Sequence, residues 1–301
     1  MKKTFIIIFV VFHLSFLGDN IIASPIADTW IYATIRIETE WGKQGTGFLV
    51  ARAIDANDTK VFLCTNKHVL NQDEKKRQTA TKIICHLNET GKDNKIVSVK
   101  HELPLAFSNG IKRWKEHPDK DVDVLVFDIT DLIIQRPKMV KKWINYGLFA
   151  DKDTLSKEDI TIGEEILVLG YPNIVPQYKS NLPIVRQGII ASQIGEKYVD
   201  EYNNKKRILR GFLIDGGVIP GSSGSPVILK PVIGRIVNNT IVMGHAKPYL
   251  LGIIAETRYS SIRPIPTKKS SILSYAGLGF VFDATTIKET IELFFAKKKS
   301  K

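Results

Sequence analysis

The chain has 301 residues, of which 44% are hydrophobic, a formal net charge of +12 and only two cysteines. A chain of this size buries roughly three-quarters of the surface of its unfolded form, so a large core without disulfides is feasible. The excess lysine is spread along the sequence and is not interleaved with aromatic residues, which argues against nucleic-acid binding and indicates a solvated surface.

Residues 1–23 have the pattern of a secretory signal peptide. Two lysines precede an apolar run over residues 4–17, and a polar stretch follows. The run is too short for a membrane span, so we expect an exported protein, periplasmic or secreted, with no stable membrane span after signal removal. The cleavage site is open because Pro25 follows two small residues directly, and an uncleaved anchor is the alternative.

Short runs rich in Val, Ile, Phe, Tyr and Thr recur along the rest of the chain, which is typical of an all-β protein. The first set of predicted strands lies at residues 30–40, 47–52, 61–66, 81–87, 96–103 and 122–129. The second set lies at residues 165–169, 184–193, 207–214, 225–236, 249–257 and 278–282. These sets predict two antiparallel six-stranded β-barrels with a cleft between them.

The domain organisation follows from these two sets. We expect an N-terminal barrel over residues 28–135, a linker with one helical turn over 136–158 and a C-terminal barrel over 159–283. Residues 284–301 are predicted to form a helix and a basic tail, because apolar residues recur among Lys and Glu at helical spacing. Nothing in the sequence specifies an oligomeric state.

The two cysteines, Cys64 and Cys85, each lie inside an apolar run. Two buried free thiols are the expected state, and a disulfide between neighbouring strands is the alternative. Neither cysteine has the spacing of a zinc site, and the sequence predicts no metal and no cofactor.

A candidate nucleophile lies in the turn GSSGSP at residues 221–226, which follows an apolar run ending at Val218. A catalytic serine needs an exposed hydroxyl at a tight turn with backbone N–H groups free to meet an oxyanion, and flanking glycines permit that geometry. Taken alone, such a sequence is just as typical of an ordinary Ser/Gly hairpin.

A histidine and an acid precede this turn. His68 follows the apolar run over residues 61–64, so a strand would deliver it to an edge. A catalytic imidazole needs a carboxylate behind it to fix its tautomer. Asp123 opens an apolar run and is the first candidate, while Asp121, on the same strand face, is the alternative. No role is expected for Asp119 and Asp128, which are predicted to be solvated strand ends. None is expected for the other histidines: His13, His86, His101, His117 and His245.

Together these motifs resemble those of bacterial trypsin-like serine peptidases of the chymotrypsin fold. Residues 65–69 (TNKHV) are similar to the histidine motif of glutamyl endopeptidases and HtrA-type proteases, and residues 170–172 (GYP) resemble a motif of their second barrel. Residues 214–226 parallel the HtrA-type nucleophile segment, and GLGF at 277–280 agrees with it. The resemblance covers about residues 30–296, and we expect no PDZ domain.

The resemblance implies a serine endopeptidase that hydrolyses peptide bonds in protein or peptide substrates through an acyl-enzyme. His68 would be the general base, Asp123 its orienting acid and Ser223 the nucleophile. The N–H groups of Gly221 and Ser223 would form the oxyanion hole.

The resemblance also implies a substrate pocket formed by Gly217, Val218, Ile219, Ala255 and Thr257. Gly217 stands where tryptic members carry an acid, and Ile254 where glutamyl endopeptidases carry a substrate-reading histidine. We therefore predict a preference for an apolar residue before the scissile bond. Ser222 replaces the aspartate that zymogen-type members pair with a new N-terminus, so activation by that route is not expected.

Two alternatives stand beside this prediction. The first is a catalytically inactive trypsin-like domain that acts as a protein-binding module, although the chain retains candidates for all three triad positions. The second is an α/β-hydrolase esterase, which requires alternating strands and helices and a histidine after the serine. Only His245 follows Ser223, and the strand pattern is all-β.

Overall fold

The computed structural model describes residues 28–70, 80–173, 181–202, 205–232, 234–237, 240–243, 247–262 and 272–296. The predicted signal peptide, the basic tail after residue 296, His13 and His245 lie outside these residues. In the part of the chain that is described, no helix has the length and apolar character needed to cross a membrane.

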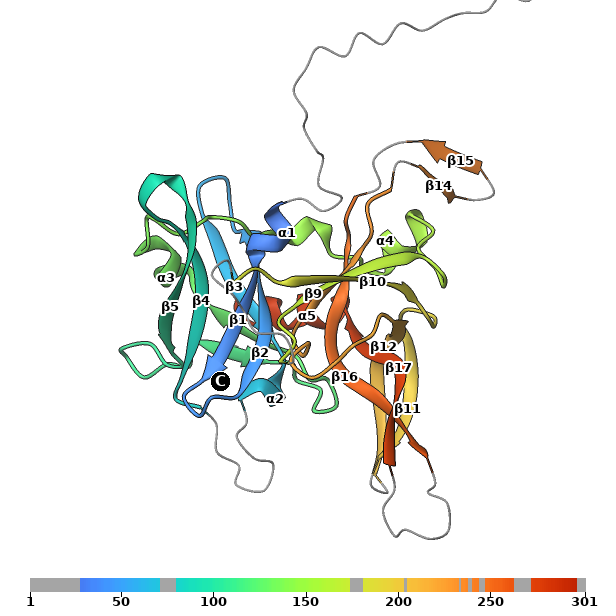
Figure 1. Ribbon diagram of the computed structural model, residues 1–301. Helices are drawn as coiled ribbons and strands as arrows, with labels where there is room; N and C mark the ends of the chain where they lie inside the picture. Colours follow the sequence, from blue (N-terminus) through green and yellow to red (C-terminus); the bar gives the residue numbers. More distant parts are fainter. Residues whose placement is uncertain are drawn as a thin grey trace, which may run out of the picture.

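The first half of the chain forms a mainly antiparallel sheet of eight strands, coloured blue to green in Figure 1. The order is β5-β4-β1-β2-β3-β7-β6, and β8 pairs with β2 in parallel. The two ends of the sheet meet where the Arg113 N–H donates to Leu105 O at 3.0 Å. The strands are β1 (Thr34–Thr39), β2 (Gln44–Ala53), β3 (Thr59–Thr65), β4 (Lys82–Thr90), β5 (Ile96–Pro104), β6 (Trp114–Glu116), β7 (Leu125–Asp128) and β8 (Ile144–Asn145).

The second half forms a seven-stranded sheet in the order β10-β9-β13-β16-β17-β12-β11. A further pairing of β10 with β12 closes every strand except β11 into a ring, which is the predicted barrel. A separate hairpin of β14 (Gly234–Val237) and β15 (Thr240–Met243) projects from it at the upper right of Figure 1. The other strands are β9 (Glu165–Gly170), β10 (Ile184–Ile190), β11 (Glu196–Tyr202), β12 (Lys205–Asp215), β13 (Pro226–Leu229), β16 (Leu250–Ile262) and β17 (Ile272–Asp283).

The all-β prediction with a C-terminal helix is confirmed, and so is a closed ring of six strands in the second half, but the sheets hold more strands than predicted. The first half has eight strands in place of six, because β6 and β8 have three and two residues and show no periodicity. β11 escapes prediction because it is an edge strand rich in charged residues. The predicted strand over residues 225–236 is two strands, β13 and β14, since Pro231 lacks the N–H needed to continue the ladder.

Two further segments differ from the prediction. The strand expected from residue 30 begins as the helix α1 (Asp28–Ala33), where Thr34 Oγ1 donates to Trp30 O at 2.8 Å. The segment 136–158 is more than a linker, since it holds β8, a 3-10 turn η2 (Tyr146–Leu148) and the helix α4 (Lys152–Lys157). The remaining short helices are α2 (Lys67–Leu70), η1 (Lys92–Asn94) and α3 (Thr130–Ile134).

The C-terminal helix α5 (Ala284–Glu292) connects the two halves. It begins at an N-cap in which Asp283 Oδ1 accepts from the Thr286 N–H at 3.2 Å. The helix follows β17 in the chain yet also packs against β6 and β7, and it lies between the two sheets in Figure 1. Arg52 of β2 donates to both carboxylate oxygens of Glu292, at 3.0 and 2.9 Å. The helix therefore holds the first half against the second.

The apolar interior is shared by the two halves. The larger core cluster contains buried residues of β1 to β4 and continues through Leu167, Leu169 and Phe280 of the second half. Cys64 and Cys85 are buried free thiols in this core, on β3 and β4, which β1 and β2 separate. Burial raises the pKa of both thiols, that of Cys85 to about 12.

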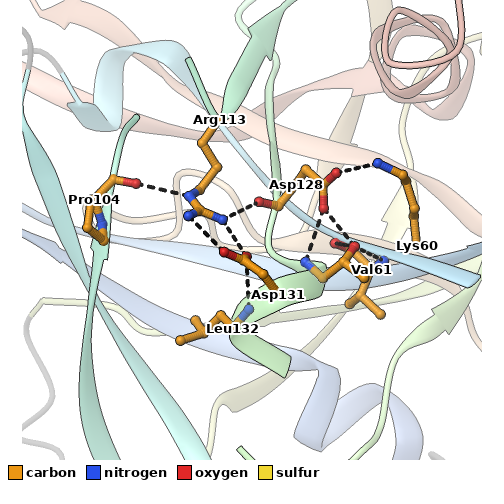
Figure 2. A network of polar contacts seen from close by, with 8 residues as sticks. Lys60, Val61, Pro104, Arg113, Asp128, Asp131 and Leu132 are labelled. Atoms are coloured by element: carbon orange, nitrogen blue, oxygen red, sulfur yellow. Dashed lines mark hydrogen bonds and ion pairs between the residues drawn. The ribbon is translucent and has the colours of Figure 1, made fainter. Parts of the chain in front are cut away.

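A buried arginine supports β7 and α3, as Figure 2 shows. Arg113, only 6% exposed, donates to Pro104 O at 3.2 Å and to Asp128 O at 3.3 Å, and it pairs with Asp131. Asp128 in turn pairs with Lys60 at 2.7 Å. The expectation that Asp128 is a solvated strand end is therefore wrong, because α3 and Lys60 cover its carboxylate and leave the residue 7% exposed.

Candidate active site

The short helix α2 and the loop before β7 bring His68 and Asp123 together. Asp123 Oδ1 accepts from the His68 main-chain N–H at 3.1 Å, and Asp123 Oδ2 hydrogen-bonds to His68 Nδ1. The two side chains are 39% and 21% exposed, respectively. With Nδ1 donating to the carboxylate, Nε2 is the ring nitrogen that can accept a proton.

The loop that carries Asp123 is fixed by the residues directly before His68. Asn66 Nδ2 donates to Asp123 O at 2.7 Å. Lys67 Nζ donates to the carbonyl oxygens of His117 and Asp119, at 3.1 and 3.2 Å. Burial lowers the pKa of the Lys67 ammonium, and the nearby carboxylates oppose this shift. The side chains of Asn66 and Lys67 thus hold the main chain of the acid's loop beside the helix that carries His68.

The same loop is also attached to the second half. His117 Nε2 hydrogen-bonds to Glu289 of α5 at 2.8 Å, and Arg210 of β12 pairs with both oxygens of that carboxylate, each at 2.8 Å. Asp121 Oδ2 accepts from the Ile208 N–H of β12 at 3.3 Å. Asp121 therefore faces the second half, and it is Asp123 that pairs with His68. His117, for which the sequence predicts no role, is a buried contact between the halves.

Ser223 lies in the turn between β12 and β13. Gly221 and Gly224 on either side of it have φ values of +94° and +87°, which glycine adopts without strain. Ser223 Oγ donates to Ala255 O of β16 at 3.4 Å, so its hydroxyl points toward that strand and not toward the imidazole. His68 and Ser223 nevertheless line one cavity of about 550 Å³, together with Gly42, Lys43, Gln44, Val69, Asn173, Pro220 and Gly221.

Every carbonyl oxygen of this turn from residue 220 to residue 223 accepts a hydrogen bond. The donors are Asn173 N to Pro220 O (3.0 Å), Thr46 Oγ1 to Gly221 O (3.1 Å), Ser225 N to Ser222 O (3.0 Å) and Thr46 N to Ser223 O (2.9 Å). Among the described residues, the N–H groups of Gly221 and Ser223 donate to no acceptor. The C=O and N–H of a trans peptide point in opposite directions, so these two N–H groups face away from the donors of the preceding carbonyls.

Four of the predicted pocket residues, Gly217, Val218, Ile219 and Ala255, are not among the residues that line the cavity just described. Val218 is 2% exposed and packs on Gly279, where an added Cβ would lie 3.0 Å from the Val218 Cβ. Ala255 is buried and Ile219 half-buried, while the main chain of Thr257 pairs with Gly279 and its side chain lies outside the described atoms. The Gly217 carbonyl accepts from Arg186 of β10, an arginine that the sequence did not single out.

Sequence reasoning also missed Thr46, at the start of β2. It stands between Gly45 and Gly47, and a Cβ at Gly45 would lie 2.9 Å from the Val69 side chain. A polar residue between two glycines at a strand start is the signal that could have pointed to it.

Replacing Ser225 with alanine is expected to leave the stability unchanged or to raise it. Its Oγ is fully buried and has no hydrogen-bond partner, so the change removes an unsatisfied hydroxyl. Gly170→Ala is the contrasting variant, because its added Cβ would overlap Ser225 Oγ and cost about 1–3 kcal/mol. Urea unfolding of both variants tests this, and a clear loss of stability in Ser225→Ala would contradict it.

The sequence over residues 45–237, more than half of the chain, matches the family model of the trypsin-like peptidase domain. The chain belongs to this family. It is therefore a serine peptidase, a hydrolase whose substrates are proteins or peptides. In the described residues, no group of three or more His, Cys, Asp or Glu side chains is placed to hold a metal ion.

Solved structures with a similar chain course include proteases. The active form of the Rv3671c protease from M. tuberculosis is 15% identical with a TM-score of 0.48, over 91% of this chain and 86% of that chain. The structure named Deg5 is 14% identical with a TM-score of 0.48, over 89% of this chain and 91% of that chain. Among curated proteins, no sequence matches this chain significantly.

Proposed function

We propose that this trypsin-like peptidase is an endopeptidase that uses His68, Asp123 and Ser223 as a catalytic triad and forms an acyl-enzyme. The observation that carries the proposal is the cavity lined by both His68 and Ser223. Asp123 hydrogen-bonds to Nδ1 of the same imidazole and to the His68 main-chain N–H. The N–H groups of Gly221 and Ser223, which have no acceptor among the described residues, supply the oxyanion hole.

Acylation begins with a rotation of the Ser223 side chain. Its hydroxyl leaves Ala255 O and donates instead to His68 Nε2. As Ser223 Oγ attacks the scissile carbonyl carbon, the hydroxyl proton passes to Nε2 and the carbonyl oxygen becomes an oxyanion. The two N–H donors stabilise this oxyanion by about 3 kcal/mol each. The C–N bond then breaks, and His68 returns the proton to the leaving amine.

Deacylation repeats these steps with water as the nucleophile. His68 Nε2 takes a proton from the attacking water, and the oxyanion forms again at the same two donors. Collapse of this intermediate breaks the bond to Ser223 Oγ, which recovers its proton from His68. Asp123 keeps Nδ1 protonated throughout and stabilises the imidazolium, so no metal or cofactor takes part in these steps.

The residue before the scissile bond is apolar in this proposal. Val218 and Ala255 are apolar and buried next to the nucleophile turn, and Gly217 brings no charge of its own. A library of peptide substrates is expected to show cleavage after apolar residues, with much slower cleavage after Lys or Arg. Cleavage confined to bonds after Glu or Asp would contradict this and would point to Arg186 as the group that reads the side chain.

Export to the periplasm or the cell exterior is also part of the proposal. It rests on the signal-like residues 1–23, whose loss on maturation can be measured by N-terminal sequencing of the protein recovered from a secreting host. An N-terminus still at Met1 in the exported protein would indicate an uncleaved anchor.

A fluorophosphonate probe tests the catalytic proposal directly. Such a probe phosphonylates a serine whose hydroxyl is activated by a neighbouring base, so we expect stoichiometric labelling that mass spectrometry maps to Ser223. Ser225→Ala, in the same turn, should be labelled as the wild type is. A folded wild-type protein that is neither labelled nor active on peptides would support the alternative of an inactive trypsin-like binding module.

A further inference from the structure

Thr46 makes two hydrogen bonds to the nucleophile turn from the other half of the protein. It lies on β2, is 0% exposed, and its main-chain N–H donates to Ser223 O at 2.9 Å. Its hydroxyl oxygen lies 3.1 Å from Gly221 O. Two of the four carbonyl oxygens between residues 220 and 223 are therefore held by this one residue.

The direction of the hydroxyl proton is fixed by a third contact. The Tyr171 N–H donates to Thr46 Oγ1 at 3.0 Å and occupies a lone pair of that oxygen. A hydroxyl has a single proton, and an N–H cannot accept one, so the Thr46 proton must point to Gly221 O. The carbonyl of Thr46 is satisfied too, because Thr65 Oγ1 donates to it at 2.8 Å.

The main chain of two neighbouring glycines packs closely against Thr46. A Cβ added at Gly224 would overlap Thr46 O, and one added at Gly170 would lie 3.2 Å from Thr46 Oγ1. Without the hydroxyl, the Gly221 carbonyl and the Tyr171 N–H would both be buried without a partner, which costs free energy in the observed arrangement and favours rotation of the peptide.

The peptide unit that Thr46 holds lies between the two oxyanion donors. Its C=O is that of Gly221, which accepts from the Thr46 hydroxyl. Its N–H is that of Ser222, and this N–H donates to Ile219 O at 3.0 Å. The dihedral angles on either side of this unit, ψ of Gly221 and φ of Ser222, set the direction of the Gly221 N–H relative to that of Ser223. Oxyanion stabilisation depends on both donors meeting one point, so holding this unit in place holds the donors in register.

We infer that Thr46 is a positioning residue of the oxyanion hole, whose hydroxyl holds the Gly221 peptide so that both N–H donors face the reacting carbonyl oxygen. The inference rests on the proposed catalytic function. It assigns Thr46 no contact with the substrate.

The test compares three variants with the wild type. Thr46→Val has nearly the same shape without the hydroxyl, and Thr46→Ser keeps the hydroxyl. Thr290→Val is the matched control, because Thr290 is fully buried and its Oγ1 donates to Thr286 O at 2.7 Å within α5.

For each protein we would measure kcat and KM on a cleaved peptide, and the inhibition constants of a peptide boronic acid and of the cleaved product peptide. The boronic acid forms a tetrahedral adduct with the serine and requires the oxyanion hole, whereas the product peptide does not.

Thr46→Val is expected to lower kcat about 10- to 100-fold, a part of the 10²- to 10³-fold effect of losing a whole oxyanion donor. KM and product affinity should stay within about twofold, while boronate affinity falls by the same factor as kcat. Thr46→Ser should restore kcat to within about threefold of the wild type, and Thr290→Val should keep wild-type kinetics. Thr46→Ala, which adds no methyl group in place of the hydroxyl, repeats the test if the valine variant does not fold.

Two results would overturn the inference. One is a Thr46→Val enzyme with wild-type kcat; the other is an equal loss of boronate and product affinity, which would assign Thr46 a structural role only. Both are distinct from failure of the proposed function, in which the wild-type protein itself would show no turnover and no labelling.

Discussion

Replacing Ser223 with alanine is expected to lower kcat by about 10⁶-fold while the protein stays folded. Without Oγ there is no nucleophile to form the acyl-enzyme, and the remaining rate comes from direct attack of water on a bound substrate. The cost in stability should be small, because among the described residues this hydroxyl makes a single hydrogen bond, the long one to Ala255 O at 3.4 Å.

Turnover of one peptide substrate by the purified variant, with circular dichroism as a check of folding, measures this effect. Ser225→Ala is the control, since Ser225 lies two residues away and its side chain points toward Gly170 and not into the cavity. A folded Ser223→Ala enzyme that keeps more than about a hundredth of the wild-type kcat would require a different nucleophile, and the triad proposal would fail.

The parts of the site that could be predicted are those that local sequence determines. Glycines on either side of Ser223 indicate a turn with positive φ. The apolar run over residues 61–64 indicates a strand that ends shortly before His68, and the run directly after Asp123 indicates a strand that begins there. The order of the three residues along the chain then selects between hydrolase folds, because each fold places them in its own order. The turn at Ser223 and the strands beside His68 and Asp123 therefore follow from residues close in sequence.

The parts that could not be predicted depend on contacts between distant segments. Thr46 is separated by 175 residues from Gly221, the residue whose carbonyl it holds, and no local pattern encodes that pairing. His117 meets Glu289 across 172 residues, and Asp128 becomes buried only because Lys60 and α3 cover it. In each case a polar side chain that would be solvated in isolation finds its partner only when segments distant in the sequence pack together.

The proposed site requires that the two halves keep a fixed position relative to each other. His68 and Asp123 come from the first half and Ser223 from the second, so a small relative displacement would separate the base from the nucleophile. The shared core, α5 and the two hydrogen bonds of Thr46 all resist that displacement. A misplacement of about 1 Å at reacting groups can cost about a hundredfold in rate, which makes this rigidity a requirement of the chemistry.

The second large effect is expected at the acid, where Asp123→Asn should lower kcat by about 10⁴-fold near neutral pH. The asparagine has nearly the same shape, so the two hydrogen bonds to His68 can be kept in geometry. However, an amide NH₂ facing Nδ1 makes that nitrogen an acceptor and places the imidazole proton on Nε2. The base then has no lone pair toward Ser223, and the developing imidazolium also loses its carboxylate.

Asp121→Asn is the matched control because it changes the neighbouring acid in the same way. Asp121 accepts from the Ile208 N–H and faces β12, so its neutralisation should change kcat by less than about threefold. The proton on His68 Nδ1 gives an independent readout, since its strongly downfield NMR resonance should be present in the Asp121 variant and absent in the Asp123 variant. Equal losses of kcat in the two variants would contradict the assignment of Asp123, because only one of the two carboxylates touches the imidazole.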